Sequence, residues 1–152
     1  MQVMSGTYTN LLFHIVFSTK ERRRLITPTI EDELHKYIGG IVRNSEGDLL
    51  EANGDLDHRH LLVVLKPKYA VSDVVRDIKA SSAGWLNGRA RLYKFGWQDG
   101  FAAFTVSESQ APRVGGYIRN QKNRHRRISY QDELIELLNK NRIKYDQRYL
   151  WR

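Results

Sequence analysis

The chain has 152 residues, of which 41% are hydrophobic and 28% charged, and it carries a formal net charge of +8 at pH 7. This composition excludes an intrinsically disordered chain and suits one globular domain over residues 1–152. The absence of cysteine excludes disulfide frameworks and thiolate metal ligands, and it fits a reducing cytoplasm. The longest apolar runs are far shorter than a membrane span, so we expect no membrane partner.

The first part of the chain predicts a strand, a helix and a second strand. Residues 9–18 are apolar at every second position, which indicates a strand. Thr27 then stands as the N-cap of a helix, with Pro28 at the first helical position and apolar residues at helical spacing behind it. Residues 48–55 predict a second strand, which runs into a turn at Asn53-Gly54.

The next part predicts a third strand, a second helix and a fourth strand. His-Arg-His and the apolar run behind it, residues 58–65, indicate a buried strand. We expect the second helix to be capped by Ser72 and to end near Asn87-Gly88, and a fourth strand over 101–107. This β-α-β-β-α-β order is the split βαβ pattern of ferredoxin-like (RRM-like) domains. It predicts an α+β fold: an antiparallel sheet of about four strands, with the first and third at its centre and two helices on one face.

Three more segments follow the predicted sheet. A helix begins near Ser109 and carries Tyr117, and a later helix with a leucine stripe is capped by Ser129. The tail, residues 143–151, is aromatic and amphipathic. We expect it to dock on the body of the protein or on a partner chain.

Two histidines stand two positions apart at the start of the third predicted strand. Because side chains alternate along a strand, His58 and His60 point to one face of the sheet and Arg59 points to the other. Two neutral imidazoles side by side can bind one metal ion. The spacing alone equally allows two ordinary polar residues at a strand entrance.

Positive charge is gathered in clusters, chiefly over residues 20–24 and 119–127. Separate basic clusters on a small domain favour a polyanion, above all nucleic acid, over a merely solvated surface. The candidate DNA-contacting residues in these clusters are Lys20, Arg22, Arg23, Arg24, Arg119, Arg124 and His125.

Tyr117 and Gln121 are four residues apart on the predicted helix, so they share a face. By themselves they are most simply a packing tyrosine and a surface amide. Gly115-Gly116 directly precedes the tyrosine, although each glycine costs a helix about 1 kcal/mol relative to alanine. The glycine pair suggests a hinge that would let the tyrosine helix reach across to a partner chain.

Taken in order, these motifs resemble a known family. The stretches are DHRHLLVVL at 57–65, YIRNQKNRHRRISYQDELIELL at 117–138 and IKYDQRYLW at 143–151. With the segments between them, they are similar in order and spacing to the single-tyrosine HUH transposases of bacterial and archaeal insertion sequences, the IS200-like transposases. The resemblance runs from about Tyr8 to Trp151.

The resemblance implies an enzyme that cuts and rejoins single-stranded DNA at hairpin-bearing element ends, through a 5′-phosphotyrosine. By position, it implies that Tyr117 is the nucleophile and that His58, His60 and Gln121 bind the metal. It implies Mg²⁺ or Mn²⁺, although two imidazoles and an amide would also suit zinc or nickel. It further implies a homodimer in a bacterial or archaeal cytoplasm.

Two departures from the family pattern stand out. Arg59 replaces the hydrophobic residue between the histidines, and Arg124-His125 replaces a pair of histidines found in many relatives. Because Arg59 points away from the histidine face, we expect the site to survive if the guanidinium reaches solvent or a carboxylate such as Asp55 or Asp57. Two alternatives stay open: an inactive nucleic-acid-binding module of the same fold, and a metal-dependent phosphodiesterase in which water attacks.

Overall fold

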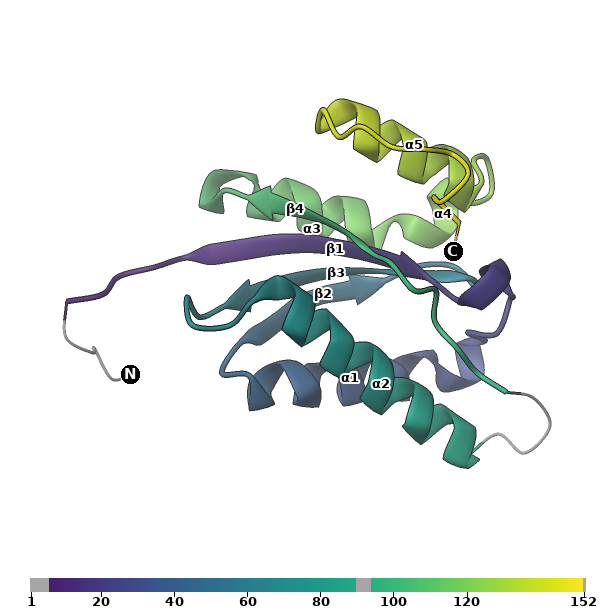
Figure 1. The fold of residues 1–152 in the computed structure, drawn as a ribbon, viewed down its shortest axis with the longest axis horizontal. Coiled ribbons are helices and arrows are strands. Elements are labelled where there is room, and N and C mark those ends of the chain that lie inside the picture. The colour runs from purple at the N-terminus through teal and green to yellow at the C-terminus, as the bar shows by residue number, and fades with distance from the viewer. Residues whose placement is uncertain (1–5, 90–93, 152) are drawn as a thin grey trace.

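The computed structural model describes residues 6–89 and 94–151. One antiparallel sheet organises the fold, with the spatial order β2-β3-β1-β4 (Figure 1). Its strands are β1 (Leu11–Ser18), β2 (Asp48–Asn53), β3 (His58–Leu65) and β4 (Ala102–Val106). The predicted order of strands and helices and the predicted central pair, β1 and β3, are confirmed.

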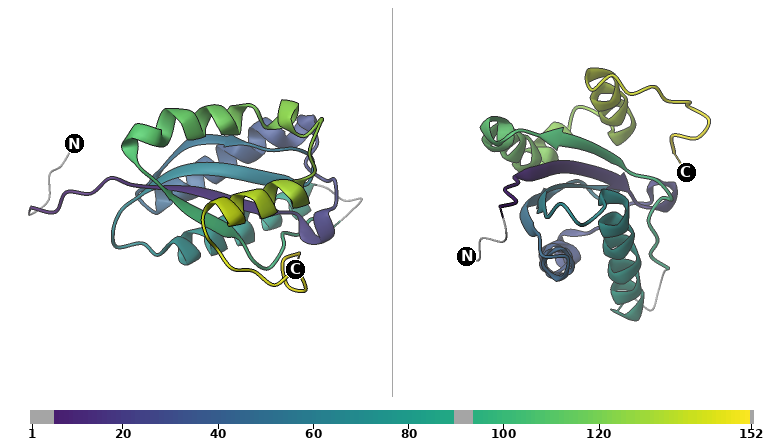
Figure 2. Two further views of the ribbon diagram at one scale, coloured as in Figure 1. Left: turned by 90° about the horizontal axis from the view of Figure 1, so that it is seen from above. Right: turned by 60° about the vertical axis from the view of Figure 1, so that its left-hand side comes forward.

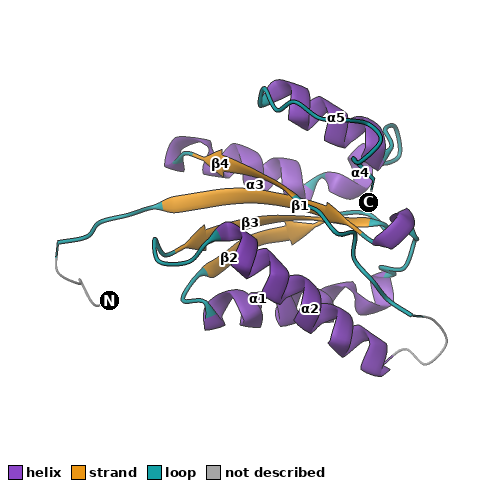
Figure 3. Cartoon of the chain, in the orientation of Figure 1, coloured by secondary structure: helices purple, strands orange, loops and turns teal. Residues whose placement is uncertain are grey.

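Helices lie on both faces of the sheet (Figure 2). One face carries α1 (Pro28–Asn44) and α2 (Val71–Arg89), and the other carries α3 (Ala111–Arg119), α4 (Gln121–Arg124) and α5 (Tyr130–Lys140). Single 3₁₀ turns, η1 (Lys20–Arg22) and η2 (Glu108–Gln110), follow β1 and β4 (Figure 3). Within the described ranges, no helix combines the length and the apolar character needed to cross a membrane.

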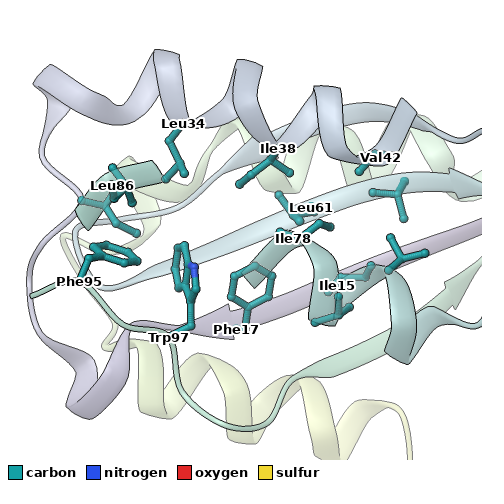
Figure 4. Packing of buried hydrophobic residues seen from close by; sticks show 14 of the residues in the cluster. Ile15, Phe17, Leu34, Ile38, Val42, Leu61, Ile78, Leu86, Phe95 and Trp97 are labelled. Carbon is teal, nitrogen blue, oxygen red and sulfur yellow. The ribbon is translucent and has the colours of Figure 1, made fainter. Parts of the chain in front are cut away.

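The larger hydrophobic core lies between the sheet and the α1–α2 pair (Figure 4). Its fully buried members include Ile15 and Phe17 of β1, Leu61 of β3, Ile38 of α1 and Ile78 of α2. Burying one such side chain stabilises the fold by about 1.5–3 kcal/mol. Side chains alternate along a strand. The neighbours of these buried residues on β1 and β3 therefore point to the opposite face of the sheet, toward α3 and α5.

A second apolar layer joins the sheet to the later helices. Leu62 of β3 packs with Ile118 of α3, and Phe104 of β4 packs in a cluster with Leu134 of α5. The tail also joins this layer, where Trp151 packs beside α5. The prediction that the aromatic tail docks on the body is therefore confirmed.

Helix ends agree with the sequence prediction at some places and differ at others. Ser129 caps α5 through its side chain, as predicted, whereas Thr27 occupies the N-cap position of α1 without a side-chain hydrogen bond. Ser72 was predicted as a cap but lies inside α2, because the carbonyl of Ala70 already accepts the first amide bonds of the helix. The tyrosine helix is also shorter than predicted, since Asn120 (φ −91°, ψ 10°) separates α3 from α4.

Arg59 is buried on the α1 side of the sheet with an exposed fraction of 0%. Its guanidinium donates to the carbonyls of His58 (2.6 Å) and Asp55 (2.5 Å) and to the imidazole of His35 (2.9 Å). The carboxylate that it finds is Glu31 of α1, at 3.4 Å, rather than one of the nearby aspartate side chains. The arginine in the histidine motif is thus fully accommodated behind the strand, and it braces the turn that leads into β3.

Candidate active site

Strand pairing sets the position of the histidine pair. His58 lies opposite Ser18 and His60 lies opposite Val16 in the β1–β3 ladder. Both imidazoles are fully buried beneath α4 and α5. The predicted shared face of the two histidines is therefore confirmed, and this face is the one that carries the tyrosine helix.

Four potential ligand atoms converge beneath α4 and α5. His58, His60, His125 and Glu133 each offer one atom, and these atoms all lie within 4.8 Å of one another. The Glu133 carboxylate lies 2.9 Å from His60 Nε2, 3.0 Å from His125 Nε2 and 3.5 Å from His58 Nε2. The amide oxygen of Gln121 is 3.0 Å from His58 Nε2, so it borders the same space.

The outer nitrogens of these imidazoles are held by other groups. His58 Nδ1 lies 2.7 Å from the Asp57 carboxylate, and His125 Nδ1 donates to the Ile128 carbonyl at 2.8 Å. A histidine that donates through Nδ1 presents the lone pair of Nε2, which is the arrangement found for metal-bound imidazoles. The donor set therefore fits a divalent cation, with nitrogen and oxygen ligands in one buried pocket.

The charges of the cluster depend on burial and on mutual hydrogen bonding. Burial lowers the pKa of His60 to about 4 and that of His14, which lies 2.8 Å from it, to about 3. Burial would also raise the pKa of Glu133, but hydrogen bonds from His125 and His60 hold it well below its usual range. The cluster thus contains a buried carboxylate ion, Glu133, close to the neutral imidazoles of His14 and His60. A buried negative charge of this kind attracts a cation.

Tyr117 points its hydroxyl into the cluster, where it donates to the carboxylate of Glu133. Its ring lies 5.7 Å from the His60 ring, and the guanidinium of Arg124 sits 5.2 Å above it. Burial raises the pKa of the Tyr117 phenol, and the negative charge of Glu133 raises it further. The cationic Arg124 acts in the opposite direction, so it is the group in contact with the ring that favours the phenolate.

The structure brings together the predicted nucleophile and the three predicted metal ligands, which are Tyr117, His58, His60 and Gln121. Gln121 follows Tyr117 by one turn across the break at Asn120, and its amide donates to Glu133 at 2.8 Å. Tyr117 meets the histidines of its own chain, and α3 runs unbroken through Gly115-Gly116. The arrangement described is one within a single chain, and the exchange across chains that the glycine pair suggested stays a prediction.

Sequence reasoning missed the role of Glu133 and assigned His125 only to the basic surface. Glu133 has an exposed fraction of 0% and lies on the buried side of α5 between Tyr130 and Leu137. A carboxylate at helical spacing among apolar residues was the available signal, because such a position is normally apolar. His125 lies one turn after Gln121, and their side chains are 2.9 Å apart.

The other basic candidates lie around the cluster or at the surface. Arg124 is half-buried, and its Nε lies 3.2 Å from Glu133 without forming a hydrogen bond to any described residue. Arg119 pairs with Glu51 of β2 at 2.7 Å. Residues 20–24 follow β1, at the end of the sheet where His58 begins β3. In this segment Lys20, Arg23 and Arg24 are exposed, and Arg22 stacks on the Trp151 ring.

Comparison with known proteins identifies relatives of this chain. Residues 7–121 match the family described as Transposase IS200 like. The transposase for insertion sequence element IS200 of Salmonella typhimurium is 30% identical over 129 residues, which cover 78% of this chain and 81% of that protein. The ISDra2 transposase TnpA of Deinococcus radiodurans is 23% identical over 125 residues, 78% of this chain and 89% of that protein.

Two solved structures share the fold. A transposase structure from Deinococcus radiodurans superimposes with a TM-score of 0.64 at 24% identity, over 80% of this chain and 98% of that one. A REP-associated tyrosine transposase bound to a REP hairpin gives a TM-score of 0.59 at 16% identity, over 82% of this chain and 74% of that one. Because the family match spans most of the sequence, from the residues before β1 to the first residue of α4, this chain belongs to the IS200-like transposase family.

Proposed function

We propose that this chain cuts and rejoins single-stranded DNA through a covalent 5′-phosphotyrosine on Tyr117. The observation that carries the proposal is the placement of the Tyr117 hydroxyl in a buried cluster of imidazole and carboxylate donors. A nucleophile next to candidate metal ligands is what phosphoryl transfer requires. Membership of a transposase family implies nuclease activity, which supports the proposal.

We further propose that His58, His60, Gln121 and Glu133 hold Mg²⁺ or Mn²⁺, with His125 at the edge of the set. When bound, such an ion would hold the scissile phosphate and offset the negative charge that develops on it. Glu133 supports this choice of ion, because its carboxylate adds the charged oxygen ligand that these ions prefer and that two imidazoles and an amide lack.

The first step of the proposed reaction is attack of Tyr117 on the scissile phosphate. Tyr117 Oη forms a bond to the phosphorus while the bond from phosphorus to the 3′-oxygen breaks, which leaves a free 3′-hydroxyl after that oxygen takes a proton from water. Glu133 accepts the hydrogen bond of the phenol and thereby orients Tyr117 Oη. Because the pKa of Glu133 lies well below its usual range, the phenol proton passes to water. Rejoining reverses the step: a 3′-hydroxyl attacks the phosphotyrosine and Tyr117 leaves, so no external energy source is needed.

We also propose hairpin-bearing single-stranded DNA as the substrate and a homodimer as the acting form. The relative bound to a REP hairpin supports the choice of substrate. Moving a DNA segment requires two ends to be cut, whereas each chain offers one such tyrosine. A two-fold homodimer, the commonest closed assembly, supplies the second tyrosine.

The test is incubation with hairpin-bearing single-stranded DNA and Mn²⁺ or Mg²⁺, followed by a denaturing gel. We expect a covalent protein–DNA adduct that Tyr117→Phe abolishes while DNA binding is retained. Tyr69→Phe is the matched control, because that hydroxyl bonds to Glu46 away from the cluster. Cleavage without an adduct would indicate the phosphodiesterase, and binding without cleavage would indicate the inactive module.

A further inference from the structure

We propose that a cavity between β4, α3 and α5 is a subsite for one unstacked nucleotide of the DNA strand, next to the phosphate that Tyr117 attacks. This inference rests on the proposed function, and it adds a position for the bound DNA strand. The cavity has a volume of about 540 Å³. That volume is within the range of about 300–1,000 Å³ found for small-molecule sites in proteins.

Part of the cavity wall is apolar and aromatic, beside polar side chains such as Thr105 and Gln110. Phe104 of β4, Val114 of α3 and Leu137 of α5 line the cavity together with Tyr117. Enzymes that hold a flipped base, and proteins that bind single strands, place such side chains against the faces of the bases. The shape and chemistry of this wall therefore suit a nucleobase that has left the stack.

The rim of the cavity is basic. Arg113 of α3 and Lys140 of α5 both line it, both are exposed, and neither forms an ion pair with a described carboxylate. No aspartate or glutamate is among the described residues that line the cavity. Two unpaired cations from different helices at the rim of an apolar pocket complement a phosphate attached to a buried base.

The cavity is also continuous with the reacting group. Tyr117 lines it and lines a second cavity of about 420 Å³, which is bordered by Arg124 and Arg127. A strand whose phosphate lies at the Tyr117 hydroxyl therefore has space beside this residue for a neighbouring nucleotide. Of the two spaces, the one with the aromatic and aliphatic wall is the one suited to a base.

Part of this subsite lies outside the segment that matches the family. The match ends at residue 121, whereas Leu137 and Lys140 belong to α5. The wall and rim contributed by α5 therefore come from the part of the chain that follows the matched residues. Because an aromatic wall accepts any base face, we expect this subsite to bind thymidine strands without a required sequence.

The experiment uses the full chain and an oligothymidine strand that carries 4-thiothymidine. Binding is followed by fluorescence anisotropy as a function of salt, and crosslinks formed under ultraviolet light are mapped by mass spectrometry. We expect crosslinks on β4, on α3 or on the second half of α5. We also expect Arg113→Glu with Lys140→Glu to reduce the log–log salt slope by about 0.7, the contribution of the one DNA phosphate that the variant no longer neutralises.

The matched control is Lys36→Glu with Arg43→Glu on α1, which makes the same charge change on the other face of the sheet and should leave the slope unchanged. No binding of oligothymidine, crosslinks confined to other surfaces, or equal slopes for the two double variants would each overturn the subsite. An adduct that depends on Tyr117 together with any of these results would leave the proposed function standing. Crosslinks in the cavity without an adduct would support the subsite and overturn the covalent step.

Discussion

The phenol of Tyr117 donates a hydrogen bond to the carboxylate of Glu133, which lies 16 residues later on a different helix. The same carboxylate accepts from the Gln121 amide and contacts the Nε2 atoms of His60 and His125. One side chain of α5 therefore links the candidate nucleophile to the candidate metal ligands. The position of α5 on the sheet sets the position of the tyrosine hydroxyl, so this helix is part of the site.

Replacing Glu133 with glutamine should weaken metal binding, because the change removes the only carboxylate that the four-residue donor cluster contains. We expect the affinity for Mn²⁺, measured by calorimetry, to fall by at least about 10–100-fold. The amide has nearly the same shape as the carboxylate, so the fold should persist.

Glu136→Gln is the control for this change, since Glu136 is an exposed carboxylate one turn along on α5. It should leave the Mn²⁺ affinity unchanged. Equal affinities for the wild-type protein and Glu133→Gln would show that Glu133 serves only to hold Tyr117 and Gln121.

Replacing both His58 and His60 with alanine should abolish binding of Mn²⁺ at this site. Their Nε2 atoms face the shared space from one side of the sheet, and nothing else on β3 replaces them. Calorimetric titration measures the loss, and circular dichroism checks that the sheet remains. Undiminished binding by the folded double variant would place the metal elsewhere.

Arg59→Ala should lower the free energy of unfolding by about 2–6 kcal/mol, because it leaves two buried carbonyls without their donor at a cost of about 1–3 kcal/mol each. Glu31 keeps its ion pair with Lys122. Urea denaturation measures the change. Arg76→Ala on the exposed side of α2 is the control, and it should stay within about 0.5 kcal/mol of the wild-type value. A small effect for Arg59→Ala would mean that water replaces the guanidinium.

The metal-free protein should lose stability as the pH falls from about 6.5 toward 4. Burial lowers the pKa of His14 to about 3 and those of His35 and His60 to about 4, so the unfolded chain takes up their protons first. Each such group adds a slope of up to about 1.4 kcal/mol per pH unit in this window. His125 opposes the trend: burial lowers its pKa, but the hydrogen bond to Glu133, the charge of Glu133 and the hydrogen bond to Ile128 together raise it.

Urea denaturation at several pH values tests this expectation. His35→Gln should reduce the slope, since His35 lies behind the sheet beside Arg59, on the side opposite the donor cluster. A stability that stayed level or rose as the pH fell through this window would show that the buried histidines are not neutral in the folded protein.

A mixture of Tyr117→Phe chains with His58→Ala, His60→Ala chains distinguishes a site built within one chain from one exchanged across chains, and a site built as the single chain shows it should leave the mixture inactive. The structure completes the site within one chain, where Glu133 joins Tyr117 to His60. In a mixed dimer each site would then lack either its tyrosine or its histidines. Cleavage by heterodimers, once their formation is shown by mass spectrometry of the intact complex, would instead establish exchange of α3 about Gly115-Gly116.

Local pattern alone determined the order of strands and helices and the placement of both histidines on one face. These properties follow from the periods of two and 3.6 residues, which belong to the backbone and need no knowledge of distant contacts. The central position of β1 and β3 followed from that order through the rules of chain connection. Single residues at helix ends were less predictable, since the amide bonds of α2 begin before Ser72.

The contents of the site were decided by tertiary packing. His60 and Glu133 are 73 residues apart, and their contact depends on the angle at which α5 lies over the sheet. The burial of Arg59 depends in the same way on Glu31 and His35 of α1 reaching its guanidinium. A sequence shows which side of its own element a residue occupies. Which side chains then face one another across two elements is set by packing of the whole core, because only that packing fixes their separation to within a hydrogen bond.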